Sequence, residues 1–280
     1  MTLNEILVDP SCSRERALIF AKLSRHVYVR DREVLNPVEY GFDEEFKIII
    51  DRKTDTECIV LFRKERREAA VVFVGTNSIQ NFINNFHFPL HELPHLRLYG
   101  KFKVHDGFAE QYMAVRDRII LQLRKNKIEK IFTAGHSLGG SLAQILALDV
   151  KLTGVTSMDS ECFTYGAPRT GNSSFANKFN KCVPKSYRFV NLFDPVPYLP
   201  FMFLTYRHPG TKHNIGCNFV DISHLKNHRK KLAPFLNFLC RLVLGTKIRY
   251  VAKLYSRHRA RSYIEMIEQG CTPKHLHSKH

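Results

Sequence analysis

Residues 130–148 read KIFTAGHSLGGSLAQILAL, which is an apolar segment, a glycine-rich turn and a second apolar segment. The pattern predicts a strand over Lys130 to Ala134 and a helix over Leu138 to Leu148. Between them, Gly135-His136-Ser137-Leu138-Gly139 has the GxSxG spacing of a nucleophile elbow, a sharp turn that strains the serine backbone and exposes its hydroxyl. The alternative is a glycine-rich turn in which Ser137 only caps the helix.

The segments around this turn alternate between strand and helix patterns. The chain has 280 residues, of which 44% are hydrophobic and 25% are charged. These values are typical of one globular domain with a sizeable core, and we assign residues 1–280 to a single domain. The alternation predicts an α/β fold with a mostly parallel central sheet and helices on both faces. The predicted strands are Phe46 to Ile50, Cys58 to Phe62, Ala69 to Val74, Cys162 to Tyr165 and Tyr187 to Phe193, and the predicted helices include Arg14 to Tyr28, Ala109 to Lys125, Ser173 to Asn180 and Arg259 to Glu268.

The charge balance is strongly basic. Lys and Arg number 43 against 26 Asp and Glu, for a net charge of +17, which attracts polyanions such as anionic membranes, nucleic acid or an acidic partner. No nucleic-acid recognition motif accompanies the charge, so we expect no specific nucleic-acid binding. Peripheral contact with an anionic membrane surface is the favoured partner prediction.

Cysteine usage and the chain start point to a reducing compartment. Seven cysteines form neither a CxxC pair nor a zinc-ligand spacing, so we predict free thiols, no metal site and no cofactor. Residues 1–5 lack the basic and apolar runs of a secretory signal. The longest apolar stretch, Leu232 to Leu244, is too short to span a bilayer. These features predict a cytoplasmic protein without a transmembrane helix, in peripheral contact with internal membranes.

A nucleophilic serine needs a base and an orienting carboxylate, which in this kind of fold follow it in the chain in the order acid, then histidine. Asp194 ends a predicted strand and precedes a proline-containing loop, as expected of such an acid. The rivals Asp149, Asp159 and Asp221 lack that placement, and the remaining alternative is an ordinary turn aspartate.

The histidine is less sharply defined by the sequence. His258 stands at the start of the last predicted helix, where a loop can carry an imidazole over the serine. His224 is the next candidate, and a third reading makes His258 one more basic residue beside Arg257 and Arg259. Those nearby cations would lower the imidazole pKa.

Five further motifs accompany the elbow in a fixed order along the chain. They are Ala21-Lys22-Leu23-Ser24 with Val27-Tyr28, Val74-Gly75-Thr76-Asn77-Ser78, Val104-His105-Asp106-Gly107-Phe108, Phe163 to Arg169 with Gly171-Asn172, and Val190 to Pro197. From about Ala21 to Tyr263 this order resembles the class 3 lipases, the group of the filamentous-fungal triacylglycerol lipases. The resemblance implies an α/β-hydrolase fold with a nucleophile elbow.

The same resemblance implies a chemistry. A lipase of this family would hydrolyse carboxylic ester bonds of acylglycerols or phospholipids, as a triacylglycerol lipase or an A1-type phospholipase. Ser137, Asp194 and His258 would form its catalytic triad and proceed through an acyl-enzyme. The alternative function is a catalytically silent lipase-fold protein that binds anionic membranes.

Two more sites follow from the resemblance. The oxyanion hole would combine Thr76 with the backbone N–H of Leu138. Residues 78–86 would form a lid helix over the site, and an amphipathic helix packed on the core is the alternative. The apolar positions of this segment, at helical spacing, are Ile79, Phe82, Ile83 and Phe86.

A basic and apolar segment spans residues 226–253, where basic residues flank the run Leu232 to Leu244. Such a segment can lie on an anionic bilayer, with each basic residue contributing about 1 kcal/mol near the surface. A core helix with solvated ends is the alternative.

Overall fold

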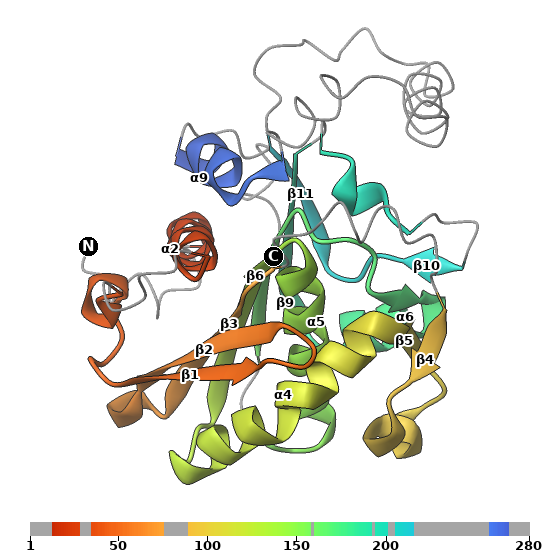
Figure 1. The fold of residues 1–280 in the computed structure, drawn as a ribbon, viewed down its shortest axis with the longest axis horizontal. Helices are drawn as coiled ribbons and strands as arrows, with labels where there is room; N and C mark the ends of the chain where they lie inside the picture. Colours follow the sequence, from red (N-terminus) through yellow and green to blue (C-terminus); the bar gives the residue numbers. More distant parts are fainter. Residues whose placement is uncertain are drawn as a thin grey trace, which may run out of the picture.

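The computed structural model describes residues 13–28, 35–75, 89–157, 160–191, 194–200, 205–215 and 258–268. A seven-stranded sheet in the order β1-β2-β3-β6-β7-β9-β11 forms the centre of this part (Figure 1). Its strands are β1 (Phe46–Asp51), β2 (Thr56–Arg63), β3 (Glu68–Phe73), β6 (Lys130–His136), β7 (Glu161–Tyr165), β9 (Lys185–Asn191) and β11 (Thr211–Ile215).

Most of this sheet is parallel. The pairs β3·β6, β6·β7, β7·β9 and β9·β11 are parallel, whereas β1·β2 and β2·β3 are antiparallel. The carboxyl ends of β6 and β9 therefore lie at the same edge of the sheet. This edge is where the elbow follows β6 and where Asp194 follows β9 after a short connection.

Helices cover both faces of the sheet, as predicted. On one face α4 (Asp106–Lys125), α5 (Leu138–Leu152) and α6 (Ser173–Cys182) share a buried apolar cluster with the strands. On the other face α2 (Ser13–His26) and α9 (Ala260–Glu268) share a second cluster. The α/β-hydrolase arrangement expected from the sequence is confirmed for the described residues.

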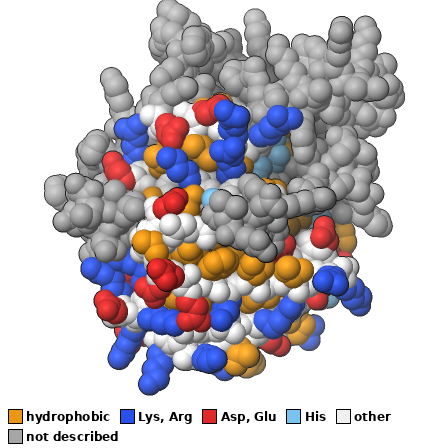
Figure 2. Space-filling model, turned by 60° about the vertical axis from the view of Figure 1, so that its left-hand side comes forward, with side chains coloured by type: hydrophobic (Ala, Val, Ile, Leu, Met, Phe, Trp, Pro, Cys, Tyr) orange, Lys and Arg blue, Asp and Glu red, His pale blue; other side chains and the backbone are white. Residues whose placement is uncertain are grey.

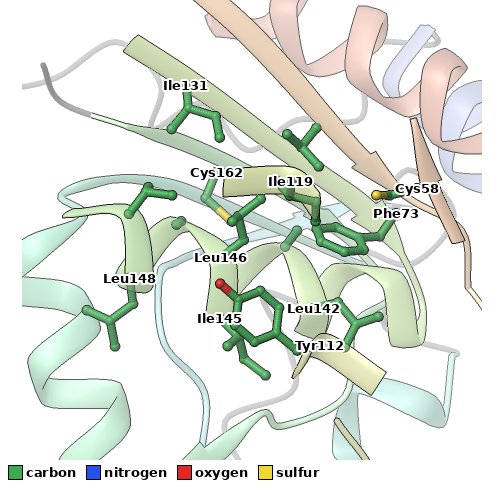
Figure 3. Close-up of a cluster of buried hydrophobic side chains, with 14 of the residues drawn as sticks. Cys58, Phe73, Tyr112, Ile119, Ile131, Leu142, Ile145, Leu146, Leu148 and Cys162 are labelled. Atoms are coloured by element: carbon green, nitrogen blue, oxygen red, sulfur yellow. The ribbon is translucent and has the colours of Figure 1, made fainter. Parts of the chain in front are cut away.

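The cluster under α5 shows why these residues form a buried layer. Helix α5 is mostly apolar and is buried from Gly139 to Val150, so it fills the space between the sheet and α4 (Figure 3). Cys58 and Cys162 lie in this cluster as free thiols, and burial raises the pKa of the Cys162 thiol to about 12. Both are therefore protonated packing residues at neutral pH.

A second, smaller sheet lies beside the first, in the order β10-β8-β5-β4. Its strands are only two or three residues long, and the sequence patterns did not predict them. They are β4 (Leu90–Glu92), β5 (Lys103–His105), β8 (Gly171–Asn172) and β10 (Tyr206–Arg207). Short 3-10 helices cover Pro37–Tyr40 (η2), Lys64–Arg66 (η3), Pro94–Tyr99 (η4) and Val196–Tyr198 (η5).

Within the described ranges, no helix combines the length and the apolar character needed to cross a bilayer. The assignment of residues 1–280 to one domain stays a prediction, because several long segments fall outside those ranges.

Candidate active site

Ser137 lies at a sharp turn between β6 and α5. Its backbone has φ 58° and ψ −132°, in the left-handed half of φ space that side-chain-bearing residues rarely adopt. Two backbone hydrogen bonds hold the turn: Ser137 N donates to Tyr165 O at 2.9 Å, and Gly140 N donates to Ser137 O at 3.0 Å. The Ser137 side chain makes no capping hydrogen bond to α5, so the reading of this serine as a simple helix cap is wrong.

Glycine at positions 135 and 139 is a steric requirement of this turn. A Cβ atom on Gly135 would lie 2.3 Å from the Gly139 carbonyl oxygen, and one on Gly139 would lie 2.5 Å from the Phe73 carbonyl oxygen. Both contacts are to backbone, which cannot move aside as a side chain could. The elbow therefore packs β6, α5 and the end of β3 closer together than any larger residue permits.

Asp194 is fully buried, and both of its carboxylate oxygens accept hydrogen bonds. The Val196 N–H donates to Oδ1 at 2.9 Å, while His258 Nδ1 lies 2.7 Å from Oδ2. Because a carboxylate can only accept here, Nδ1 of His258 carries the hydrogen, which leaves the Nε2 lone pair free to act as a base.

Tyr263 in α9 also binds Asp194. Its hydroxyl donates to Oδ2 at 2.6 Å and accepts from the Asn191 N–H at 3.2 Å. Burial and the neighbouring Asp194 charge raise the pKa of Tyr263 well above its usual value, so it stays a neutral donor. Gly166, with φ 60°, makes room for this contact, because a Cβ there would lie 2.8 Å from both the Asp194 oxygen and the Tyr263 hydroxyl.

His258 lies beside the elbow. Its ring centroid is 4.6 Å from that of His136, the residue before Ser137, and its side chain is buried. Ser137 Oγ and His258 Nε2 are both buried, and neither has a hydrogen-bond partner among the described residues. The structure thus joins Asp194 to His258 and brings both to the elbow, without a hydrogen bond between the serine and the histidine. Such bonds are often long until substrate binds.

His136 stands inside the GxSxG motif, but its contacts were not predictable from that motif. Its Nε2 donates to the backbone carbonyl oxygen of His258, and its Nδ1 accepts from the Tyr28 hydroxyl at 3.0 Å. A carbonyl can only accept, so His136 is neutral with its hydrogen on Nε2. Burial, then the neighbouring His258, lowers the pKa of His136 well below its usual value.

Because of this lowered pKa, we expect acid to destabilise the fold below about pH 6.5, the ordinary histidine pKa. Below that pH, His136 binds a proton in the unfolded chain but stays neutral in the folded chain. The contribution of neutral His136 to the free energy of unfolding is therefore complete above that pH and falls as the pH drops. The expected slope from His136 is about 1.4 kcal/mol per pH unit. The free energy of unfolding, from urea titrations at pH 7.5, 6.5 and 5.5, measures it.

Two variants separate this effect from general acid sensitivity. For His136→Gln, the slope of the free energy of unfolding against pH is expected to fall by about 1.4 kcal/mol per pH unit, the amount due to one proton. His91→Gln, at an exposed position, is expected to keep the slope of the original chain. Equal slopes for the two variants would contradict the account of His136.

Leu138 begins α5, where backbone N–H groups have no acceptor inside the helix. Its N–H is therefore available to an anionic oxygen held above Ser137.

Several other predicted features lie outside the described residues. These are Thr76, the lid segment 78–86 with Ile79, Phe82, Ile83 and Phe86, the alternative base His224, and the basic and apolar segment 226–253. Within the described ranges, no group of three or more His, Cys, Asp or Glu side chains could hold a metal ion.

Comparisons with known proteins bear on this arrangement. The family model described as "Lipase (class 3)" matches residues 70–204, which include the elbow and Asp194. Over this stretch, which is just under half of its length, the chain resembles the class 3 lipases. Among the relatives of this chain, "Secreted mono- and diacylglycerol lipase 1" of Fusarium solani is 29% identical over 196 residues, covering 69% of this chain and 57% of the relative. "Lipase" of Rhizomucor miehei is 32% identical, covering 62% and 50%. The chain thus spans about half the length of these relatives.

Solved structures support the same fold. A triacylglycerol lipase in which a serine protease triad is reported to form the catalytic centre matches with a TM-score of 0.61 and 28% identity, over 73% of this chain and 80% of that one. The mono- and diacylglycerol lipase from Aspergillus oryzae matches with a TM-score of 0.62 and 26% identity, over 75% and 81%.

One expectation from the sequence is overturned by these comparisons. The chain was predicted to be cytoplasmic, but relatives from Fusarium solani and Penicillium cyclopium are named as secreted lipases. The prediction of a cytoplasmic location is therefore wrong. It rested on residues 1–5 and on cysteine spacing, and neither feature determines a compartment.

Proposed function

We propose that this chain is a class 3 lipase that hydrolyses carboxylic ester bonds of acylglycerols through an acyl-enzyme on Ser137. The observation that carries the proposal is the buried Asp194–His258 pair, joined at 2.7 Å and lying beside a serine held in a left-handed elbow. Serine hydrolases use these groups as acid, base and nucleophile. The names of the relatives, which include mono- and diacylglycerol lipases, support the acylglycerol class.

In the first half of the proposed reaction, His258 Nε2 takes the Ser137 Oγ proton as Oγ attacks the ester carbonyl carbon. The carbonyl oxygen becomes an oxyanion, which the Leu138 N–H stabilises together with Thr76. The tetrahedral intermediate then breaks its bond to the alcohol oxygen. The imidazolium of His258 gives that oxygen its proton, and the acyl group remains on Ser137.

In the second half, water replaces the alcohol. His258 Nε2 removes a proton from water, the hydroxyl attacks the acyl carbon, and the fatty acid leaves as Oγ regains its proton. Asp194 stays ionised throughout and stabilises the imidazolium of each half-reaction. The hydrogen bonds from Val196 and Tyr263 hold its two oxygens in the orientation that this role needs.

The excess of basic residues can support binding to a lipid surface. A net charge of +17 attracts an anionic interface, although on the face in Figure 2 the Lys and Arg side chains are interspersed with Asp and Glu around a band of hydrophobic side chains. We therefore propose peripheral binding to anionic lipid surfaces as a property of the whole chain. Hydrolysis of phospholipids in the A1 position is the finer proposal.

The test is fatty-acid release by the purified full chain from separate emulsions of mono-, di- and triacylglycerol and from neutral and anionic phospholipid vesicles. A fluorophosphonate probe, which phosphonylates activated serines, is applied in parallel, and the labelled peptide is identified by mass spectrometry. We expect release from acylglycerols and a single adduct on Ser137. Release from phospholipid vesicles would add the A1-type activity.

The opposite result has a definite meaning. A folded chain that binds anionic vesicles, releases no fatty acid from any of these lipids and takes up no probe would be a silent lipase-fold membrane binder. Labelling at a serine other than Ser137 would overturn the proposed nucleophile.

A further inference from the structure

Arg188 is a buried cation without a partner among the described residues. It lies in the middle of β9 with 7% of its surface exposed, and its guanidinium makes no hydrogen bond or ion pair within the described residues. Its Nε–H is fully buried and unsatisfied. A buried guanidinium normally pairs with a carboxylate, because an unpaired charge in the interior costs several kcal/mol.

The groups around Arg188 add positive charge. Arg169, 8% exposed, donates through Nη1 to the carbonyl oxygens of Tyr198 and Pro200, the latter at 2.6 Å. Desolvation, then the charge of Arg207, lowers the pKa of Arg169 to about 10. Desolvation, then the charge of Arg169, lowers the pKa of Arg188 to about 10, so both side chains are still charged at neutral pH.

The partly buried His208 lies in the same electrostatic environment. Its Nε2 lies 2.5 Å from the Pro197 carbonyl oxygen, while its Nδ1 is buried without a partner among the described residues. Burial, then Arg188 and Arg169, lowers the pKa of His208 well below its usual value. The surroundings of this imidazole are therefore dominated by positive charge.

Within the described part of the chain, the side chains that favour the charge on Arg188 are tyrosines, which carry no charge of their own. Tyr198 and Tyr263 are the two, and burial raises the pKa of each above its ordinary value. The nearby carboxylate of Asp194 is occupied by Tyr263, His258 and a backbone N–H. Within the described residues, the positive charges of Arg188 and Arg169 thus have no counterion.

Within the described residues, the hydroxyl of Thr164 is a further unsatisfied group beside Arg188. Thr164 is the residue opposite Arg188 in the β7·β9 register, so both side chains leave the same face of the sheet. The Thr164 hydroxyl is fully buried and has no hydrogen-bond partner in the described part of the chain. A guanidinium and a hydroxyl thus occupy neighbouring positions on one face of the sheet, and neither has an acceptor among the described residues.

We propose that Arg188, with Thr164 and Arg169 around it, binds a small inorganic anion that neutralises this buried pair of cations. Guanidinium and hydroxyl N–H and O–H groups are the donors that such anions accept from. Chloride is the expected occupant, because it is the smallest common anion and needs only converging donors. Sulfate and phosphate share the chemistry and are the larger alternatives.

The anion would act on the loop that carries Asp194. Arg169 and His208 contact the carbonyl oxygens of Pro197, Tyr198 and Pro200, which follow Asp194 in the chain. Neutralising the pair of cations would keep these two side chains beside the loop. The bound ion is thus expected to stabilise the fold at a distance from the reacting atoms.

The experiment is thermal unfolding of the full chain at constant ionic strength as gluconate is replaced by chloride, sulfate or phosphate. We expect chloride to raise Tm along a saturating curve, by about 3 °C at roughly ten times its Kd. Line broadening of the ³⁵Cl NMR signal on adding protein measures binding directly. A Tm rise that is specific to sulfate or phosphate would assign the site to an oxyanion.

Arg188→Met removes the charge and the donors at similar length, and Arg124→Met is the matched control at an exposed position. We expect Arg188→Met to lose both the chloride-dependent Tm rise and the line broadening, and to match or exceed the original chain in Tm in gluconate. Arg124→Met is expected to keep both chloride effects. If Arg188→Met fails to fold, Arg188→Lys is expected to raise the Kd for chloride at least tenfold.

Either of two outcomes would overturn the proposal. The first is no difference in Tm between gluconate and any of the three small anions, together with no line broadening. The second is an equal response to chloride in Arg188→Met and Arg124→Met, which would reduce the effect to general screening of the net charge.

Discussion

Replacing Ser137 by alanine is expected to lower kcat for ester hydrolysis by about 10⁶-fold, because it removes the atom that forms the acyl-enzyme. The residual rate comes from the oxyanion hole and from substrate binding alone. The measurement is kcat on a soluble short-chain ester, where no lipid interface complicates the rate. The alanine leaves the backbone conformation of the elbow unchanged, so the free energy of unfolding should change little.

Ser141→Ala is the matched control for this variant. Ser141 lies four residues further along α5, is also fully buried, and donates its hydroxyl to the Pro168 carbonyl oxygen at 3.4 Å. Its loss is expected to cost about 1 kcal/mol of stability and to leave kcat within a few-fold of the original. If Ser137→Ala kept more than 1% of the activity, the nucleophile would have to be another group.

The main sheet was predictable because its strands carry strong local signals. Strands β2, β3 and β7 are buried on both faces, so their sequences are nearly continuous apolar runs bounded by polar turns. The elbow was predictable because its glycines are fixed by close backbone contacts, which any sequence with this turn must respect. Asp194 was predictable from its place after a strand.

Other elements were missed because their cause is not local. Strand β11 has the sequence Thr-Lys-His-Asn-Ile, which is polar at an exposed edge, and it forms only because β9 offers a pairing edge. The short strands β4, β5, β8 and β10 likewise depend on contacts between segments far apart in the chain. No sequence period of two can be recognised in elements of two or three residues.

The contacts around the site show the same limit. His136, Tyr28 and Tyr263 were each present in a recognised motif or segment, yet their hydrogen bonds join residues separated by 69 to 122 positions in the chain. Sequence spacing predicts neighbours along one helix or strand and carries no information on such pairs. Only the fold brings them together.

Asp194→Asn is the second large effect that we expect, with kcat falling by about 10⁴-fold. An asparagine amide that turns its NH₂ toward Nδ1 of His258 acts as a donor facing a donor. The imidazole then moves its hydrogen to Nε2, where it can no longer accept the Ser137 proton. The measurement is kcat on the same soluble ester, with circular dichroism to confirm that the variant is folded.

Tyr263→Phe is the comparison variant. It removes one hydrogen bond to Asp194, whereas Asp194→Asn removes the carboxylate charge and changes the His258 tautomer. The tyrosine donates to the same Oδ2 atom that His258 contacts, and phenylalanine removes that donor while Asp194 stays ionised. We expect only about a tenfold fall in kcat, since a hydrogen bond to a charged group contributes about 1.5–3 kcal/mol and part of that loss appears as stability. An Asp194→Asn variant no worse than Tyr263→Phe would mean that Asp194 orients His258 without its charge mattering, and the imidazolium would need another source of stabilisation.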